Sequence, residues 1–364
     1  MGDFDKQRTR RPWLIAFSIM VLFCAVYSGL WLVLALSSRD QLVNWIEEQK
    51  DQGFNVRYDR LQATGYPFAI CIEITNPGLG VPNNPASWDW QGTSLRVMAQ
   101  LWDRNSFRLE TSGLQVLAFN KAGQIKKFSG DIDYALGQLV LSEDKIKKVG
   151  ITLRGVQLTN RDNPNTAISI PSAQLSLDRL QGAKVDNQSA SWSLSGSTIG
   201  FSLPLFKASP LGLKLLLSFK ARLLGNIKAG PLVQSLEDWR DRGGIIELEK
   251  LKMQHGPLKI NTNGTLALDD KLQPIGALTA NIEGFFETID ALKRLEVINA
   301  RIAITAKMML GVLSRTPAGG GPAILNLALT AQERHLYLGP VRLLKLPEIN
   351  WLQLLSLRLW ASRQ

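Results

Sequence analysis

The chain has 364 residues, of which 45% are hydrophobic, and a formal net charge of +11. Its hydrophobic content supports an extensive core and excludes a disordered chain. The basic residues are scattered rather than clustered, so we expect a solvated basic surface that does not bind nucleic acid.

An apolar segment near the N-terminus predicts a membrane anchor. Residues 12–38 contain no charged side chain. A helix rises about 1.5 Å per residue, so Trp13 to Trp31 would span roughly 27 Å of a hydrocarbon core about 30 Å thick. Trp13, Tyr27 and Trp31 are the aromatic residues that we expect near the two membrane interfaces.

The charges on either side of this segment predict its direction. Four basic residues precede it: Lys6, Arg8, Arg10 and Arg11. On the other side, Arg39 stands beside Asp40. Because positive charge favours the cytoplasmic side, we expect residues 1–11 in the cytoplasm, one crossing over residues 12–38, and the rest of the chain outside.

A cleaved signal peptide is the alternative to an uncleaved anchor. The apolar region of a signal peptide is usually about 7–15 residues long and ends at small residues. The segment here is longer, and residues 35–37, Ala-Leu-Ser, would make a poor cleavage site. We therefore favour an uncleaved signal anchor.

A short juxtamembrane helix is expected over residues 39–53. Asp40 can cap its start and Gly53 can end it. Trp45, Ile46 and Gln49 would lie on one face of this helix, which we expect to dock onto the following domain.

Residues 54–345 are expected to form one β-rich domain, mainly β with some α. Apolar and polar residues alternate with the period of a strand over many segments separated by turn residues. The longest early segments are residues 68–75, 94–101, 107–119, 128–135, 147–158, 167–180 and 190–203. This series predicts an extended, curved antiparallel sheet.

A few helices are expected to cover that sheet. Residues 231–242, 285–297 and 301–313 carry apolar residues at helical spacing. A soft boundary is placed near 204–210, although one continuous sheet is the equal alternative. Residues 346–364 form an apolar tail, which either packs into the core or touches a membrane or partner.

The chain offers no recognisable catalytic motif. His255 and His335 have no companion histidine at metal-ligand spacing, and both are interpreted as surface turn residues. Cys24 falls in the apolar segment and Cys71 in an alternating run, so Cys71 is interpreted as a strand residue. We expect no catalytic, metal or cofactor site; a hydrolase with an unrecognised site is a distant alternative.

Three tryptophans are candidate groove residues: Trp88, Trp90 and Trp102. Trp88 and Trp90 should point to the same side of a strand, because side chains repeat every second residue. They could line a groove for acyl chains or sugars, or they could cover one end of the core.

Several short motifs resemble one known family. In order they are GYPFAI at 65–70, NPGL at 76–79, WDW at 88–90, SLRV at 94–97, NGTLALD at 263–269, QPIGALT at 273–279 and LYLGPV at 336–341. The ordered set resembles the DUF2125 family, membrane-anchored alphaproteobacterial proteins without an assigned activity, over roughly residues 40–345. That family usually has an acidic residue where Gln91 stands here.

The resemblance implies a bacterial inner-membrane protein with its main domain in the periplasm. Its single anchor and many strands are similar to those of AsmA-like envelope proteins, which present a curved sheet with an apolar groove. The first hypothesis is a non-enzymatic protein that binds lipid acyl chains in envelope maintenance or lipid transport. The second is a scaffold that binds an envelope protein through a sheet edge or the C-terminal tail.

Overall fold

The structure is a computed structural model. It describes residues 11–81, 87–100, 102–121, 124–143, 145–163, 167–180, 189–201, 215–228, 230–338, 341–346, 348–349 and 351. Lys6, Arg8 and Arg10, the boundary region 204–210 and most of the 346–364 tail lie outside these residues.

A single long helix, α1 (Arg11–Asp51), opens the described chain. The prediction of a second helix capped by Asp40 is wrong, because no glycine or proline interrupts the residues around it and the helix continues without a break. Gly53 ends the helix as predicted, with φ +91 and its N–H donated to the Lys50 carbonyl at 2.9 Å. Ala35 and Ile46 are buried where the helix meets the sheet.

Seventeen strands of the described residues form one sheet. The early strands are β1 (Asn55–Arg57), β2 (Arg60–Thr64), β3 (Ala69–Thr75), β4 (Gly78–Val81), β5 (Trp88–Gln100), β6 (Asp103–Lys121), β7 (Gln124–Ser142), β8 (Lys145–Asn160), β9 (Ala167–Arg179) and β10 (Ala190–Phe201). The later ones are β11 (Leu215–Leu224), β12 (Ile245–His255), β13 (Leu258–Leu268), β14 (Pro274–Glu283), β15 (Leu325–Gln332), β16 (His335–Leu338) and β17 (Val341–Lys345).

The pairings confirm a mainly β fold with an antiparallel sheet. From β5 to β17 each strand pairs with the next along the chain. At the other end, β5 pairs with both β3 and β4, which in turn pair with β2 and β1. Because β10 pairs with β11, the sheet is continuous across the interval that contains residues 204–210.

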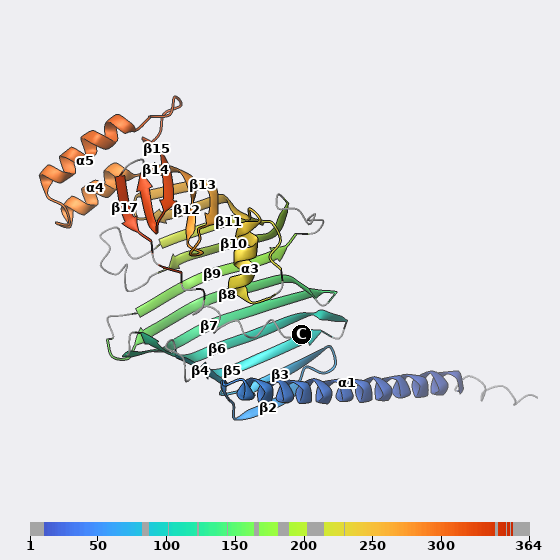
Figure 1. The fold of residues 1–364 in the computed structure, drawn as a ribbon. Coiled ribbons are helices and arrows are strands. Elements are labelled where there is room, and N and C mark those ends of the chain that lie inside the picture. The colour runs from blue at the N-terminus through green and yellow to red at the C-terminus, as the bar shows by residue number, and fades with distance from the viewer. Residues whose placement is uncertain are drawn as a thin grey trace, which may run out of the picture.

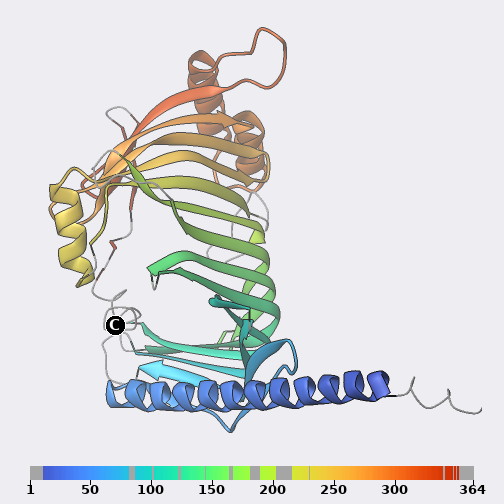
Figure 2. The same cartoon turned by 90° about the vertical axis from the view of Figure 1, so that its right-hand side faces the viewer.

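The sheet curls into an open C above α1 (Figure 2). Helix α1 runs along the base beside β2 and β3, and its N-terminal half projects beyond the sheet (Figure 1). Among the described residues, the later helices are α3 (Leu232–Asp241), α4 (Phe285–Arg294) and α5 (Ala300–Leu313), close to the predicted ranges. Helices α4 and α5 form a pair at the end of the sheet far from α1 (Figures 1 and 2).

Helix α3 supplies the best-covered part of the core. Leu236 and Trp239 pack there against Leu268 and Leu272, and Trp351 of the C-terminal tail joins the same cluster. Trp239 is 1% exposed and donates its indole N–H to the Leu224 carbonyl at 2.8 Å. Gly244 leaves room for the indole, since a Cβ there would lie 2.2 Å from Trp239 Cε2.

Replacing Trp239 by alanine is expected to destabilise the protein by about 3–5 kcal/mol, because a large buried side chain leaves a cavity. Unfolding in denaturant, followed by circular dichroism, measures the change. Trp102→Ala removes the same atoms from a side chain that is 68% exposed, and it should change the free energy of unfolding by less than about 0.5 kcal/mol. Equal losses in the two variants would contradict this assignment of the core.

Candidate functional site

One face of the sheet carries apolar side chains from the strands beside α1 to the far end. Residues paired across neighbouring strands lie on the same face, so the registers define transverse rows. The first row contains no polar residue: Ile70, Ala99, Phe107, Leu139, Val149, Leu177, Leu194, Ala221, Leu248, Gly264, Leu278, Leu329 and Leu338. We call this row, together with the next two rows along the same side of the sheet, the apolar face.

The two neighbouring rows have almost the same character. One is Ile72, Val97, Leu109, Gly137, Ile151, Leu175, Gly196, Phe219, Leu251, Thr262, Ala280 and Leu327. The other is Ile74, Leu95, Thr111, Ala135, Leu153, Ala173, Thr198, Leu217, Met253, Ile260, Ile282 and Leu325. With strands about 4.8 Å apart, each row is roughly 50 Å long.

The opposite face is polar, as alternation requires. The row between the last two contains Glu73, Arg96, Glu110, Leu136, Thr152, Gln174, Ser197, Ser218, Lys252, Asn261, Asn281 and Asn326. Arg96 pairs there with Glu73 at 2.7 Å. Further along this face, a hydrogen bond from Lys220 lowers the pKa of the Glu249 carboxyl.

The middle of the apolar face is open. Leu109, Ile151 and Leu175 lie in one row, with Gly137 between the first two, and their exposed fractions are 39%, 43% and 41%. Toward the ends, Ile72 and Ala280 of the same row are buried. Completing the burial of a side chain that is two-fifths exposed is worth about 1 kcal/mol, so an apolar ligand would be stabilised here.

Helix α3 identifies the apolar face as the inner side of the C. The helix packs on Leu223 and Ile246, which pair with each other across β11 and β12. Each lies two residues from a member of the first row, Ala221 in β11 and Leu248 in β12. Leu223 and Ile246 therefore share the face of that row. Figures 1 and 2 place α3 on the open side of the C. The curvature therefore turns the apolar face inward.

A line of irregularities crosses strands β5 to β8. Register shifts fall between Gly92 and Ser94 and between Thr111 and Gly113, and Gly155 of β8 has φ +60. The first shift inserts a residue in β6 and the second inserts one in β7. Beyond this line, Phe128, Val156 and Leu158 form a buried cluster against which Leu153 packs.

Two of the predicted groove aromatics lie at the end of β5 beyond this register shift. Trp88 pairs with Phe119, and Phe119 stacks on Phe128 with ring centroids 5.7 Å apart. Trp90 follows two residues later on the same side and donates its indole N–H to Gln115 Oε1 at 3.0 Å. The prediction that Trp88 and Trp90 share one side of a strand agrees with this register.

Trp102 does not join them. It follows the far end of β5 in the turn to β6 and is 68% exposed. At about 3.3 Å per residue, the length of β5 separates it from Trp88 by roughly 40 Å. A single groove containing all three tryptophans is therefore excluded.

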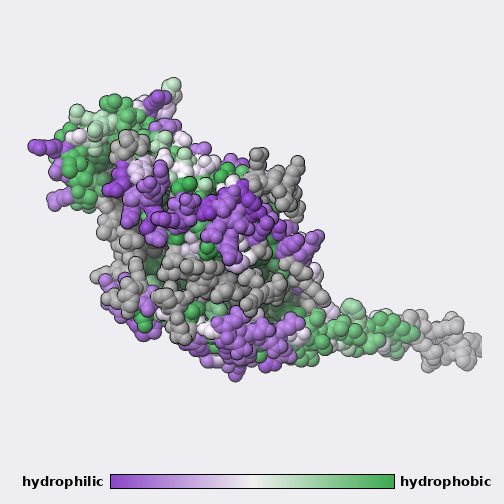
Figure 3. All heavy atoms as spheres, viewed as in Figure 1, coloured by the Kyte–Doolittle hydropathy of each residue, from purple (hydrophilic) through white to green (hydrophobic). Residues whose placement is uncertain are grey.

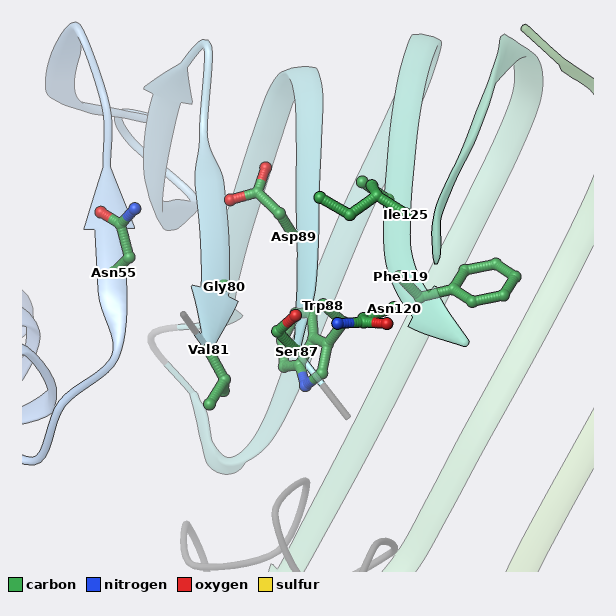
Figure 4. A pocket seen from close by; sticks show the side chains of 10 residues that line it. Asn55, Gly80, Val81, Ser87, Trp88, Asp89, Phe119, Asn120 and Ile125 are labelled. Carbon is green, nitrogen blue, oxygen red and sulfur yellow. The ribbon is translucent and has the colours of Figure 1, made fainter. Parts of the chain in front are cut away.

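A small pocket lies beside Trp88. Figure 4 shows Trp88, Ser87 and Asn120 together, with Val81 on the neighbouring strand. Its volume is about 150 Å³, below the range of roughly 300–1,000 Å³ that small-molecule sites occupy. The buried indole N–H of Trp88 has no hydrogen-bond partner among the described residues, so it could donate to a polar group at this end.

The predicted membrane aromatics Tyr27 and Trp31 contact the sheet domain. Tyr27 donates its hydroxyl to the Pro67 carbonyl at 2.5 Å, and Trp31 donates its indole N–H to the Ala69 carbonyl at 3.0 Å. Trp31 also meets Tyr66 edge to face, with ring centroids 5.3 Å apart. Trp13, by contrast, is 73% exposed near the start of α1.

The remaining titratable candidates lie in strands. His255 ends β12 and is buried, so its interpretation as a surface turn residue is wrong. His335 begins β16 and its Nδ1 lies 2.8 Å from the Glu333 carbonyl oxygen. Cys71 is buried in β3, and burial raises the pKa of its thiol, which disfavours the thiolate. Among the described residues, no group of three or more His, Cys, Asp or Glu side chains could hold a metal ion.

Two other surfaces of the described residues are strongly apolar. Figure 3 shows green surface on α1 and on the α4–α5 pair. Met308, Met309 and Val312 of α5 are 65%, 65% and 87% exposed. The stretch of α1 from Trp13 onward is the one described helix long and apolar enough to cross a membrane.

The chain thus has an N-terminal apolar helix and an open antiparallel sheet with one continuous apolar face. Residues 31–347 match the family model DUF2125, an uncharacterized protein conserved in bacteria. The chain belongs to this family. No curated protein and no solved structure matches it.

Gly155 offers a test of this line of irregularities. An alanine there would hold a positive φ and place its Cβ 1.9 Å from Asp133 Oδ2, so Gly155→Ala should destabilise the protein by at least about 1–2 kcal/mol. Gly137→Ala is the control, since its Cβ would meet Leu109 at an ordinary 3.6 Å; it should be neutral or stabilise by up to about 1 kcal/mol. Thermal unfolding measures both variants, and an unaffected Gly155→Ala protein would contradict the assigned geometry.

Proposed function

We propose that the protein is a non-enzymatic, single-pass anchored protein of the bacterial inner membrane whose apolar face binds lipid acyl chains in the periplasm. The open middle of that face, at Leu109, Ile151 and Leu175, carries the proposal. One leaflet of a bilayer core is about 15 Å deep, so rows roughly 50 Å long exceed the length of an acyl chain. Such a surface suits envelope maintenance or lipid transport, as in AsmA-like proteins.

The contacts of α1 support an uncleaved anchor. Tyr27 and Trp31 bind the turn before β3, and Ala35 at the poor cleavage site is 1% exposed. Cleavage after residue 37 would remove these packed side chains and leave the carbonyls of Pro67 and Ala69 without their donors. The basic residues at the N-terminus support a cytoplasmic N-terminus and a periplasmic domain.

The anchor proposal predicts that the mature protein keeps its N-terminus. A small epitope tag placed before residue 1 should remain on the protein in membranes that resist alkaline carbonate extraction. Immunoblotting against this tag and a C-terminal tag measures both ends. A mature protein that carries the C-terminal tag alone would identify α1 as a cleaved signal.

Lipid binding is tested with two matched double variants. Ile151 and Leu175 are cross-strand partners on the apolar face, and Thr152 and Gln174 are the adjacent partners on the polar face. Native mass spectrometry of the full chain should find phospholipid adducts on the wild type and on Thr152→Glu/Gln174→Glu. Ile151→Glu/Leu175→Glu should lose most of them, because buried carboxylates disfavour acyl chains.

Both double variants place two carboxylates opposite each other on neighbouring strands. Charge repulsion alone would therefore affect the two variants equally and cannot explain a difference in lipid retention. Lipids held around α1 should be common to all three proteins. Equal lipid retention in the three would therefore contradict binding at the apolar face.

A periplasmic scaffold is the second candidate function. The exposed apolar side chains of α5, foremost Val312, favour it. Lys307 of α5 forms an ion pair with Asp290 of α4 at 2.7 Å. This apolar surface therefore lies on two helices that are held together by a charged contact. A lipid-free mass in the same spectra, together with a bound protein at fixed ratio, would favour the scaffold.

A further inference from the structure

We propose that the exposed aromatic residues at the α1 end of the sheet form a second membrane contact, immersed at the boundary of the bilayer that α1 crosses. This contact consists of Tyr66 and Phe68 in the β2–β3 turn and Trp102 in the β5–β6 turn, and we call it the aromatic rim. The inference rests on the proposed anchoring by α1 and adds where the domain sits.

The length of α1 gives the first argument. From Trp13 to Val26, before the first residue that contacts the β2–β3 turn, the helix is only about 20 Å long. A hydrocarbon core is about 30 Å thick. If the domain stayed wholly in water, α1 would be too short to cross the core without strong thinning of the bilayer.

Exposed residues further along α1 give the second argument. Leu30, Leu32, Val33 and Leu36 are 60%, 52%, 65% and 45% exposed, although they follow Tyr27. Filling a core of about 30 Å from Trp13 brings its far boundary close to Val33. A boundary near Val33 places most of the exposed apolar side chains of α1 in the hydrocarbon core. This boundary lies further along the helix than Tyr27 and Trp31.

The β2–β3 turn is fixed at that level. Ser28 Oγ lies 2.8 Å from the Tyr66 hydroxyl, one helical turn from the Trp31 contact with Ala69. Tyr66 remains 53% exposed and Phe68 68% exposed beside the helix. A turn held at this depth must enter the membrane wherever α1 does.

Three carbonyls at this turn already have hydrogen-bond partners. The Gly65 carbonyl accepts the Ala69 N–H at 3.0 Å, and the Pro67 and Ala69 carbonyls accept donors from Tyr27 and Trp31. Proline itself has no N–H to satisfy. Non-helical backbone is tolerated at membrane depth only when its polar groups are paired in this way.

Trp102 extends the rim along the same end of the sheet. Ala69 pairs with Gln100, so the turn after β5 lies next to the turn before β3. Trp102 is 68% exposed there. Tryptophan and tyrosine favour the headgroup boundary because their rings are apolar and their N–H or O–H remains near water.

Spin labels on the full-length protein test the rim. Single cysteines replace Phe68 or Trp102 in a Cys24→Ala/Cys71→Ala background, and nitroxide-labelled protein is placed in vesicles of phosphatidylethanolamine and phosphatidylglycerol. Collisions with dissolved oxygen, which concentrates in lipid, are compared with collisions with a water-soluble nickel chelate. Val21→Cys in α1 marks the hydrocarbon, and Gln157→Cys on an exposed strand position marks water.

The expected oxygen-to-nickel ratio at positions 68 and 102 is severalfold above that at position 157, with position 21 highest. A ratio at 68 and 102 equal to that at 157, with 21 still in lipid, would overturn the rim and leave the anchor intact. A water-like ratio at position 21 would overturn the anchor proposal, and the rim with it.

Discussion

The structure depends on one constraint: a long sheet carries an apolar face that no second sheet covers within the described part of the chain. Sheets normally bury such a face against another layer. Here α3 covers a distal portion around Leu268 and Leu272, while Leu109, Ile151 and Leu175 remain about two-fifths exposed in the middle. The curvature of the sheet reduces the solvent exposure of this face without removing it. The opposite face is polar, with partly exposed ion pairs such as Arg96 and Glu73.

Helix α1 is a structural element of the sheet domain as well as an apolar segment. Tyr27 and Trp31 bind the turn before β3, and Ile46 is buried further along the same helix. No flexible linker separates the two parts, since the helix is continuous from Arg11 to Asp51. The orientation of the apolar face relative to any membrane that α1 enters is therefore set by the fold.

Much of the secondary structure could be predicted from local pattern. Residues 107–119 and 167–180 were expected as strands; the first lies within β6 and the second matches β9 to within one residue. β7 extends well beyond the predicted 128–135, because bulges interrupt its alternation and hide its continuation. The break expected at Asp40 does not occur, since a capping residue within a helix-compatible sequence does not stop the helix. His255 is buried because its strand end meets the neighbouring strands β11 and β13.

The sequence by itself determined the apolar N-terminal helix, the series of strands and the absence of a recognisable catalytic motif, because these follow from composition and from periods of two and 3.6 residues. Only the tertiary structure decided which side chains form the apolar face. Its rows join residues such as Leu109, Ile151 and Leu175, which are far apart in the chain and meet only through strand register. The length of β5 separated Trp102 from Trp88, and the packing of α1 against the β2–β3 turn set Tyr66 beside Trp31. Local pattern contains none of these distances, because they depend on where each hairpin turns and each bulge falls.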